Sequence, residues 1–103
     1  MSLGQLELKI LWTKTFLGLS LNQISQNKIL PLTNYFFWPK TDAWEQLQIE
    51  LTLKPWLKNS EKVEILNLAA EVMNFWRNNR NKDNFEQDLK KSFPTVRIVK
   101  STL

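Results

Sequence analysis

Residues 35–45 read YFFWPKTDAWE and mark the point where strand-like alternation gives way to helical spacing. Five aromatic residues fall within ten positions of this stretch. Pro39 disfavours helical backbone at Trp38. Asp42 and Glu45, three positions apart, have the spacing of a helix N-cap and its reciprocal partner. We therefore expect a helix to begin near Asp42.

Strand periodicity lies on both sides of this stretch. Residues 6–12 and 17–22 alternate apolar and polar side chains, and the polar break between them indicates a hairpin. Residues 95–100 also alternate and are rich in β-branched side chains. Pro31 argues against a central strand around it, because proline cannot donate to a strand ladder. These patterns predict a small three-stranded antiparallel sheet.

Helical spacing accounts for most of the remaining chain. The first helix should end just before Pro55. A long helix is expected from the cap Ser60 to about Arg77, and its single narrow polar stripe suggests that it is the central helix. A short helix should follow between the cap Asp83 and Pro94. The predicted fold class is α+β, a small three-stranded antiparallel sheet with two main helices and a short third helix.

The composition indicates one globular domain over residues 1–103 and excludes several classes of function. Hydrophobic residues make up 43% of the chain, which is enough to form a core without disulfide bonds or a structural metal ion. The sequence has no cysteine and no histidine, which removes thiol nucleophiles, imidazole bases and the commonest zinc ligands. The carboxylates lie at helical spacings typical of caps and solvated faces. We expect no enzyme, no cofactor, no metal and no small-molecule substrate.

No apolar run approaches the length of a membrane span, so no membrane partner is expected. The first residues, MSLGQLELKILW, carry Glu7 and Lys9 within their apolar run, which is not typical of a secretory signal. They are not Arg-rich and Ser-rich either, so we do not expect a transit peptide.

The net charge of +4 is unevenly distributed along the chain. Residues 1–40 carry +3, residues 41–76 carry −3 and residues 77–103 carry +4. A polyanion should therefore contact the two terminal parts. A solvated basic face or an acidic protein partner remains open as the alternative. The candidate RNA-binding residues are Lys9, Lys14, Lys40, Arg77, Arg80, Lys82, Lys90, Lys91, Arg97 and Lys100.

The clustered aromatic residues have a structural and a functional interpretation. The structural one is that they cap the core and join the loop to the first helix, and the functional one is that they dock a protein. A stacking platform for bases is less favoured, because only Lys40 is interleaved with the rings. The candidate corner comprises Tyr35, Phe36, Phe37, Trp38, Trp44 and Trp56.

Three stretches of sequence resemble one known family. They are YFFWPKTDAWEQL at 35–47, LKPWL at 53–57 and ILNLAAEVMNFW at 65–76, and the resemblance spans roughly residues 6–77. The chain resembles the plastid-specific ribosomal protein three family, found in the small ribosomal subunit of plastids and cyanobacteria. Residues that correspond to family positions are Trp38, Pro39, Asp42, Trp44, Glu45, Pro55, Trp56, Asn67, Phe75 and Trp76.

The resemblance implies a non-catalytic constituent of the small ribosomal subunit that binds ribosomal RNA and neighbouring ribosomal proteins, with an influence on translation as a further implication. The alternative is a non-ribosomal adaptor that docks a protein through residues 35–44. The part beyond residue 77 is expected to be a basic C-terminal extension, 78–103, whose role rests on charge. Ten Asn and eleven Lys against three Arg favour a plastid, the chloroplast stroma, over a cyanobacterial cytoplasm.

Overall fold

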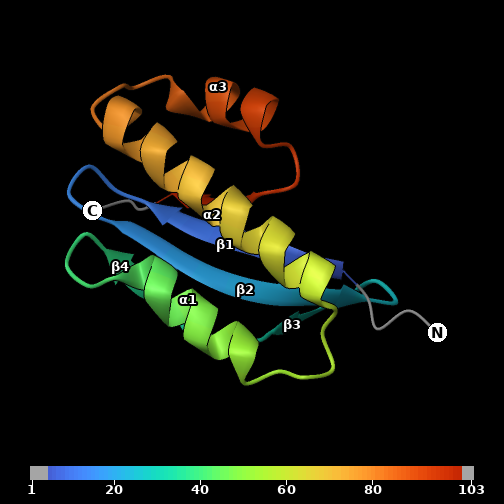
Figure 1. Ribbon diagram of the computed structural model, residues 1–103. Coiled ribbons are helices and arrows are strands. Elements are labelled where there is room, and N and C mark those ends of the chain that lie inside the picture. Colours follow the sequence, from blue (N-terminus) through green and yellow to red (C-terminus); the bar gives the residue numbers. More distant parts are fainter. Residues whose placement is uncertain (1–4, 101–103) are drawn as a thin grey trace.

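The structure of the protein is a computed structural model that describes residues 5–100, with only the backbone described for Lys100. Figure 1 shows α1 and α2 lying on one side of a sheet. Phe85 of α3 stacks on Trp12 of the sheet with ring centroids 4.0 Å apart, so α3 covers the same face. The elements in chain order are β1 Gln5–Trp12, β2 Leu17–Ser25, β3 Lys28–Pro31, β4 Phe36–Trp38, α1 Ala43–Thr52, α2 Asn59–Asn79, α3 Phe85–Ser92 and β5 Arg97–Lys100.

The sheet is mixed, curled and five-stranded, with the order β3-β2-β1-β5 and β4 paired to β2. The strands β1 and β2 are antiparallel, whereas β5 runs parallel to β1. The α+β class is confirmed, but the predicted three-stranded antiparallel sheet is wrong. A parallel pair needs a long crossover, and the three helices between β4 and β5 provide it.

Two strands were missing from the sequence prediction for different reasons. The strand β3 pairs only with β2, at an edge, so Pro31 occupies a position where a missing N–H is tolerated. The strand β4 has three residues, too few for alternation to be recognised. A two-residue turn joins β2 to β3 through Gln26 and Asn27, which have positive φ angles of 50° and 66°. Such φ values match the primed turns that fit the twist of a hairpin.

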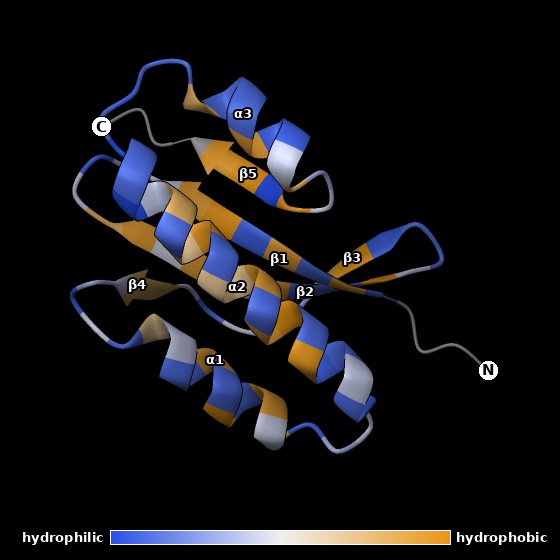
Figure 2. Cartoon of the chain, turned by 45° about the horizontal axis from the view of Figure 1, so that its top comes forward, coloured by the Kyte–Doolittle hydropathy of each residue, from blue (hydrophilic) through white to orange (hydrophobic). Residues whose placement is uncertain are grey.

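The core lies between the sheet and the helices. The paired strands β1 and β2 place Leu8 opposite Leu21 and Ile10 opposite Leu19, and all four side chains are fully buried. Figure 2 shows the apolar residues of both strands beneath α2, which confirms its predicted central position. The helices contribute the buried apolar residues Ala43, Leu47, Leu51, Ile65, Ala69, Val72, Met73, Trp76, Phe85 and Leu89.

Only the first of the three predicted caps is correct. The Asp42 side chain accepts a hydrogen bond from the Glu45 N–H at 3.1 Å, as predicted. The second helix begins after Lys58 rather than Ser60, and the third after Asn84 rather than Asp83, and neither has a side-chain cap hydrogen bond. Capping preferences are small compared with the tertiary packing that fixes where these helices start.

The sheet face away from the helices carries a buried polar network centred on Glu7. Its Oε1 accepts hydrogen bonds from Asn22 Nδ2 at 3.1 Å and from Arg97 Nε at 2.8 Å, and the residue is 8% exposed. Burial by itself raises the pKa of the Glu7 carboxyl. The hydrogen bonds from Arg97 and Asn22, with the positive charges of Arg97 and Lys9, outweigh burial and hold this pKa below its usual value. The network therefore joins β1, β2 and β5.

Replacing Glu7 with alanine should lower the free energy of unfolding by about 1–3 kcal/mol at pH 7, because Asn22 loses its partner in a buried position. Since the folded-state pKa is lowered, this stabilisation is fully present above the usual carboxyl pKa and is lost as pH falls through the lowered value. Urea unfolding of the unsubstituted protein and of the Glu7→Ala variant, at pH 7 and pH 3, measures the difference in the free energy of unfolding. Glu71→Ala, at an exposed position, is the control. A Glu7→Ala deficit that is equal at both pH values would contradict this role.

Candidate nucleic-acid interface

Three segments far apart in sequence meet at one end of the molecule. They are the β1–β2 turn, the β4–α1 loop and the C-terminal end of α2, all on the left in Figure 1. Trp76 Nε1 donates a hydrogen bond to the carbonyl oxygen of Thr13 at 2.8 Å. The rings of Trp76 and Trp38 meet edge to face with centroids 5.4 Å apart. These contacts fix the relative positions of four exposed bases, Lys14, Lys40, Arg77 and Arg80, which we call the basic end.

Two of these bases are stacked on tryptophan rings. The Arg77 Cζ atom lies 5.2 Å from the ring centroid of Trp38, and the Arg80 Cζ atom lies 5.4 Å from that of Trp76. Such cation–π contacts orient a guanidinium while leaving its N–H edges in solvent. Neither arginine forms an ion pair with a residue that the structure describes. Their donors are therefore available for bidentate contact with phosphate.

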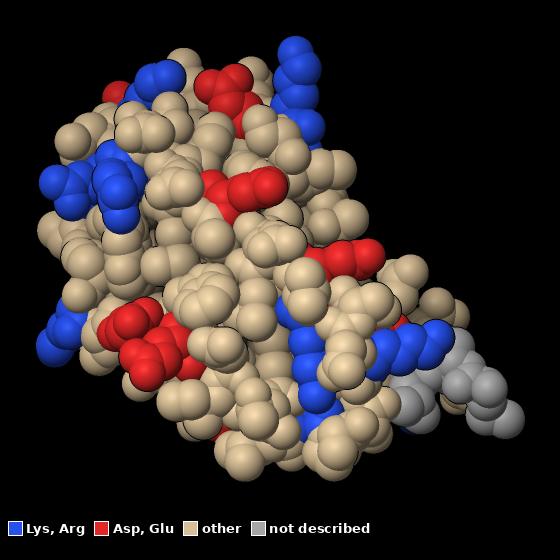
Figure 3. All heavy atoms as spheres, in the orientation of Figure 1, with Lys and Arg blue, Asp and Glu red and all other residues tan. Residues whose placement is uncertain are grey.

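The basic end is distinct from the acidic middle of the chain. Figure 3 shows basic side chains along the left end of the molecule, whereas the rest of this face carries acidic side chains interspersed with further basic ones. Because residues 41–76 carry a net charge of −3, a polyanion would be attracted to the end where α2 finishes more than to the preceding part of the chain.

The other candidate bases lie elsewhere. Lys9 and Arg97 are register partners on neighbouring strands, so the last strand lies beside the first hairpin. Arg97 is bonded to Glu7, and the Lys9 Nζ atom lies 5.5 Å from the Tyr35 ring centroid. The charges of Lys9 and Arg97 therefore already interact with groups of the protein itself.

Four bases remain in the basic C-terminal part of the chain. Lys82 is exposed in the α2–α3 loop, and Lys90 and Lys91 are exposed in the last turn of α3. The backbone of Lys100 pairs with Trp12, and its side chain lies outside what the structure describes. Among the described side chains, the structure brings together the four bases of the basic end, whereas Lys90 and Lys91 lie on a separate helix, α3.

The predicted aromatic corner divides into three environments. Phe36, Trp38 and Trp44 pack against the core, and Trp44 Nε1 donates to the carbonyl oxygen of Leu66 at 3.0 Å. Tyr35 and Phe37 lie against the face of the sheet opposite the helices, with ring centroids 6.2 Å apart. Trp56 stands apart in the α1–α2 loop and is 51% exposed. The six rings therefore do not form one surface.

Sequence reasoning missed Gly18, which allows the Tyr35 and Phe37 rings to lie on the sheet. A Cβ atom at this position would come within 3.1 Å of Leu11 Cβ and within 3.2 Å of ring atoms of Tyr35 and Phe37. A larger residue would therefore push the rings outward. The signal was the single glycine inside an alternating strand, which often marks a close approach of another segment.

Within residues 5–100, the structure places no three Asp or Glu side chains where they could hold a metal ion. None of the helices in that range is long and apolar enough to cross a bilayer.

The sequence comparisons agree on one family. A family model described as plastid and cyanobacterial ribosomal protein (PSRP-3 / Ycf65) matches residues 32–79. Small ribosomal subunit protein cS23 of Gracilaria tenuistipitata var. liui is 41% identical over 91 residues, which cover 88% of this chain and 91% of that protein. Probable small ribosomal subunit protein cS23 of Synechococcus sp. (strain JA-2-3B'a(2-13)) is 45% identical over 71 residues, covering 69% and 72%.

The similarity extends to a further algal protein. Small ribosomal subunit protein cS23 of Cyanidium caldarium is 38% identical over 76 residues, which cover 74% of this chain and 75% of that protein. Identities of this size over most of both chains identify a common family rather than a shared motif. The chain belongs to the PSRP-3/Ycf65 family of plastid and cyanobacterial small-subunit ribosomal proteins.

Proposed function

We propose that this protein contacts the ribosomal RNA of the small subunit through the basic end. The chain is a small-subunit ribosomal protein of a plastid or cyanobacterial ribosome and not an enzyme. Contact with RNA goes beyond this family membership, and the charge and geometry of the basic end support it. A non-ribosomal adaptor that docks through residues 35–44 finds no support in a family of ribosomal proteins. We favour a plastid ribosome because of the Asn and Lys bias of the sequence.

The observation that carries the proposal is the stacking of Arg77 on Trp38 and of Arg80 on Trp76. The two tryptophans are themselves in contact, so both guanidiniums are supported by one rigid unit. Preorganised arginines lose less conformational entropy when they bind phosphate. Contacts of this kind position a protein on the RNA backbone and do not read its bases.

The remaining bases contribute long-range electrostatic attraction but do not form a preorganised phosphate-binding site. Lys82, Lys90 and Lys91 are three of the six bases in residues 78–103, but no ring orients them in the described structure. We propose that this extension strengthens association with RNA through its charge, in proportion to the counterions it releases. Tyr35, Phe37 and Trp56 are left as candidates for contact with neighbouring proteins.

Site-specific photo-crosslinking in assembled small subunits tests the proposal. A photo-reactive residue replaces Asn78, which lies between Arg77 and Arg80, or Asn67, about three turns earlier on the same helix. Both asparagines are exposed, so neither replacement disturbs the core. We expect crosslinks to ribosomal RNA from position 78 and few or none from position 67. Crosslinks from position 78 to protein alone would refute RNA contact at the basic end, provided that sedimentation shows the chain in the small subunit.

A further inference from the structure

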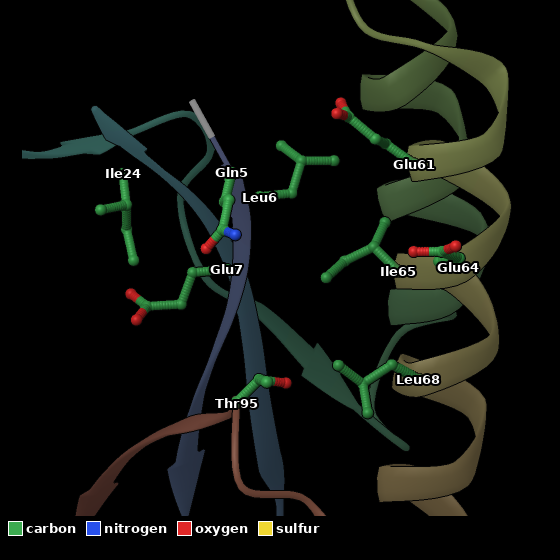
Figure 4. A pocket seen from close by; sticks show the side chains of 9 residues that line it. All are labelled: Gln5, Leu6, Glu7, Ile24, Glu61, Glu64, Ile65, Leu68 and Thr95. Atoms are coloured by element: carbon green, nitrogen blue, oxygen red, sulfur yellow. The ribbon is translucent and has the colours of Figure 1, made fainter. Parts of the chain in front are cut away.

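A cleft of about 380 Å³ lies at the opposite end of the molecule from the basic end. Figure 4 shows it between the first residues of β1 and the N-terminal half of α2. Its apolar wall is formed by Leu6 of β1 with Ile65 and Leu68 of α2. Thr95, which precedes β5, also lines the cleft. The cleft is open to solvent. It lies beside the first residues of β1, next to the point where β5 begins.

One wall of this cleft is an open strand edge. The strand β1 pairs with β2 from Gln5 to Trp12, whereas β5 pairs with β1 only from Lys9 onward. Gln5, Leu6 and Glu7 therefore have no strand neighbour on the β5 side among the described residues. In a strand, alternate backbone N–H and C=O groups point toward each side. An edge of this kind is a template for an added strand.

The helical wall is acidic. Glu61 and Glu64 line the cleft from the first turns of α2, and neither forms an ion pair with another described residue. The carboxylate of Glu7 is already paired with Arg97. No lysine or arginine within the described part of the chain lines the cleft. This charge repels RNA phosphates and attracts a cationic protein segment.

We propose that the cleft receives an extended segment of a neighbouring small-subunit protein, rich in lysine or arginine, which adds to β1 at Gln5–Glu7. Strand addition supplies main-chain hydrogen bonds, and pockets for alternate side chains supply selectivity. Apolar side chains of the segment contact Leu6, Ile65 and Leu68, and long cationic side chains reach Glu61 and Glu64 at the rim. The inference goes beyond RNA contact at the basic end, because it concerns another surface and another class of partner.

Binding of a designed peptide to the full chain without RNA tests this directly. The probe is a ten-residue peptide with threonine at every second position and with valine and lysine taking turns at the others, so that valine and lysine lie on the same face of the strand. Two-dimensional amide NMR reports where it binds. We expect amide shifts at Gln5–Glu7 and around Ile65, and none at Arg77 or Arg80. Because exposed ion pairs are individually weak, Glu61→Gln together with Glu64→Gln should weaken binding only about tenfold. Failure to bind, or shifts spread over all acidic surfaces, would overturn the proposal.

Two matched controls separate strand addition from general charge attraction. The first is Glu45→Gln with Glu71→Gln, which removes the same charge from exposed positions outside the cleft and should leave affinity unchanged. The second is the same peptide N-methylated at alternate residues, which keeps its charge but cannot donate to the strand edge and should bind weakly. Equal weakening by both double variants, or equal affinity of the methylated peptide, would overturn strand addition.

Crosslinking in purified small subunits provides the second readout. A photo-reactive residue in place of Thr95, which is exposed beside the cleft, should crosslink to a protein segment containing lysine or arginine. A crosslink to RNA alone, or to a second copy of this chain, would overturn the proposed partner. Neither result depends on whether the basic end binds RNA, so the two proposals fail separately.

Discussion

Replacing Trp76 with alanine is expected to lower the free energy of unfolding by about 3–5 kcal/mol, the range for removing a large aromatic side chain from a core. Trp76 is 1% exposed, and it is the largest of the fully buried side chains that the structure describes. The change also removes the hydrogen bond to Thr13 and the edge contact with Trp38. Urea denaturation of the full chain, followed by far-ultraviolet circular dichroism, measures the loss.

Trp56→Ala is the matched control, because Trp56 is 51% exposed in the α1–α2 loop. Its removal should cost less than about 1 kcal/mol, as for other partly exposed positions. If the two substitutions reduced stability equally, the role of Trp76 as the central support of the basic end would be wrong.

Replacing Lys14, Lys40, Arg77 and Arg80 together with glutamine should weaken binding to isolated small-subunit ribosomal RNA by about two to three orders of magnitude at 0.15 M salt. Each phosphate contact on duplex RNA releases counterions, so the slope of log affinity against log salt should fall by about 0.9 per lost contact. Fluorescence anisotropy over a salt series measures both the affinity and the slope. The substituted side chains are exposed, so the thermal midpoint should change little.

The control for this variant keeps the fold and removes charge elsewhere. Lys28→Gln, Lys58→Gln and Lys62→Gln change residues that lie outside the basic end, and should reduce the slope much less per residue. If this control set reduced RNA affinity more per residue than the basic-end set, RNA contact would have to be assigned to another surface.

The parts of the fold that could be predicted from sequence are those specified by local patterns. The alternation of Leu8 and Ile10 located β1, and Asp42 with Glu45 located the start of α1. The polar stripe on residues 61–77 identified the central helix. These features depend on residues within one or two turns, so a single sequence contains the information.

The parts that could not be predicted depend on contacts between distant segments. Residues 97–100 were recognisable as a strand, but their parallel direction is set by the helices that precede them. The charges of Arg77 and Arg80 could be read from the sequence. Their stacking on tryptophan rings could not, because Trp38 approaches Arg77 only when β4 pairs with β2. Lys90 and Lys91 had the same charge signal, and nothing local indicated that α3 holds them on a separate element.

The parallel pairing of β5 with β1 has a consequence for how this protein is made. Glu7 and Arg97 are bonded across 90 positions of sequence, so the sheet has a long-range closing contact. During translation, β1, β2 and the helices leave the exit tunnel before β5 does, and β1 keeps an unpaired edge along Lys9–Trp12 until then. The sheet can therefore be completed only after β5 has been synthesised. A nascent chain that stalls after Ser92 and before Arg97 contains the sequence of every helix of the described fold but cannot form the link that joins β1 to β5.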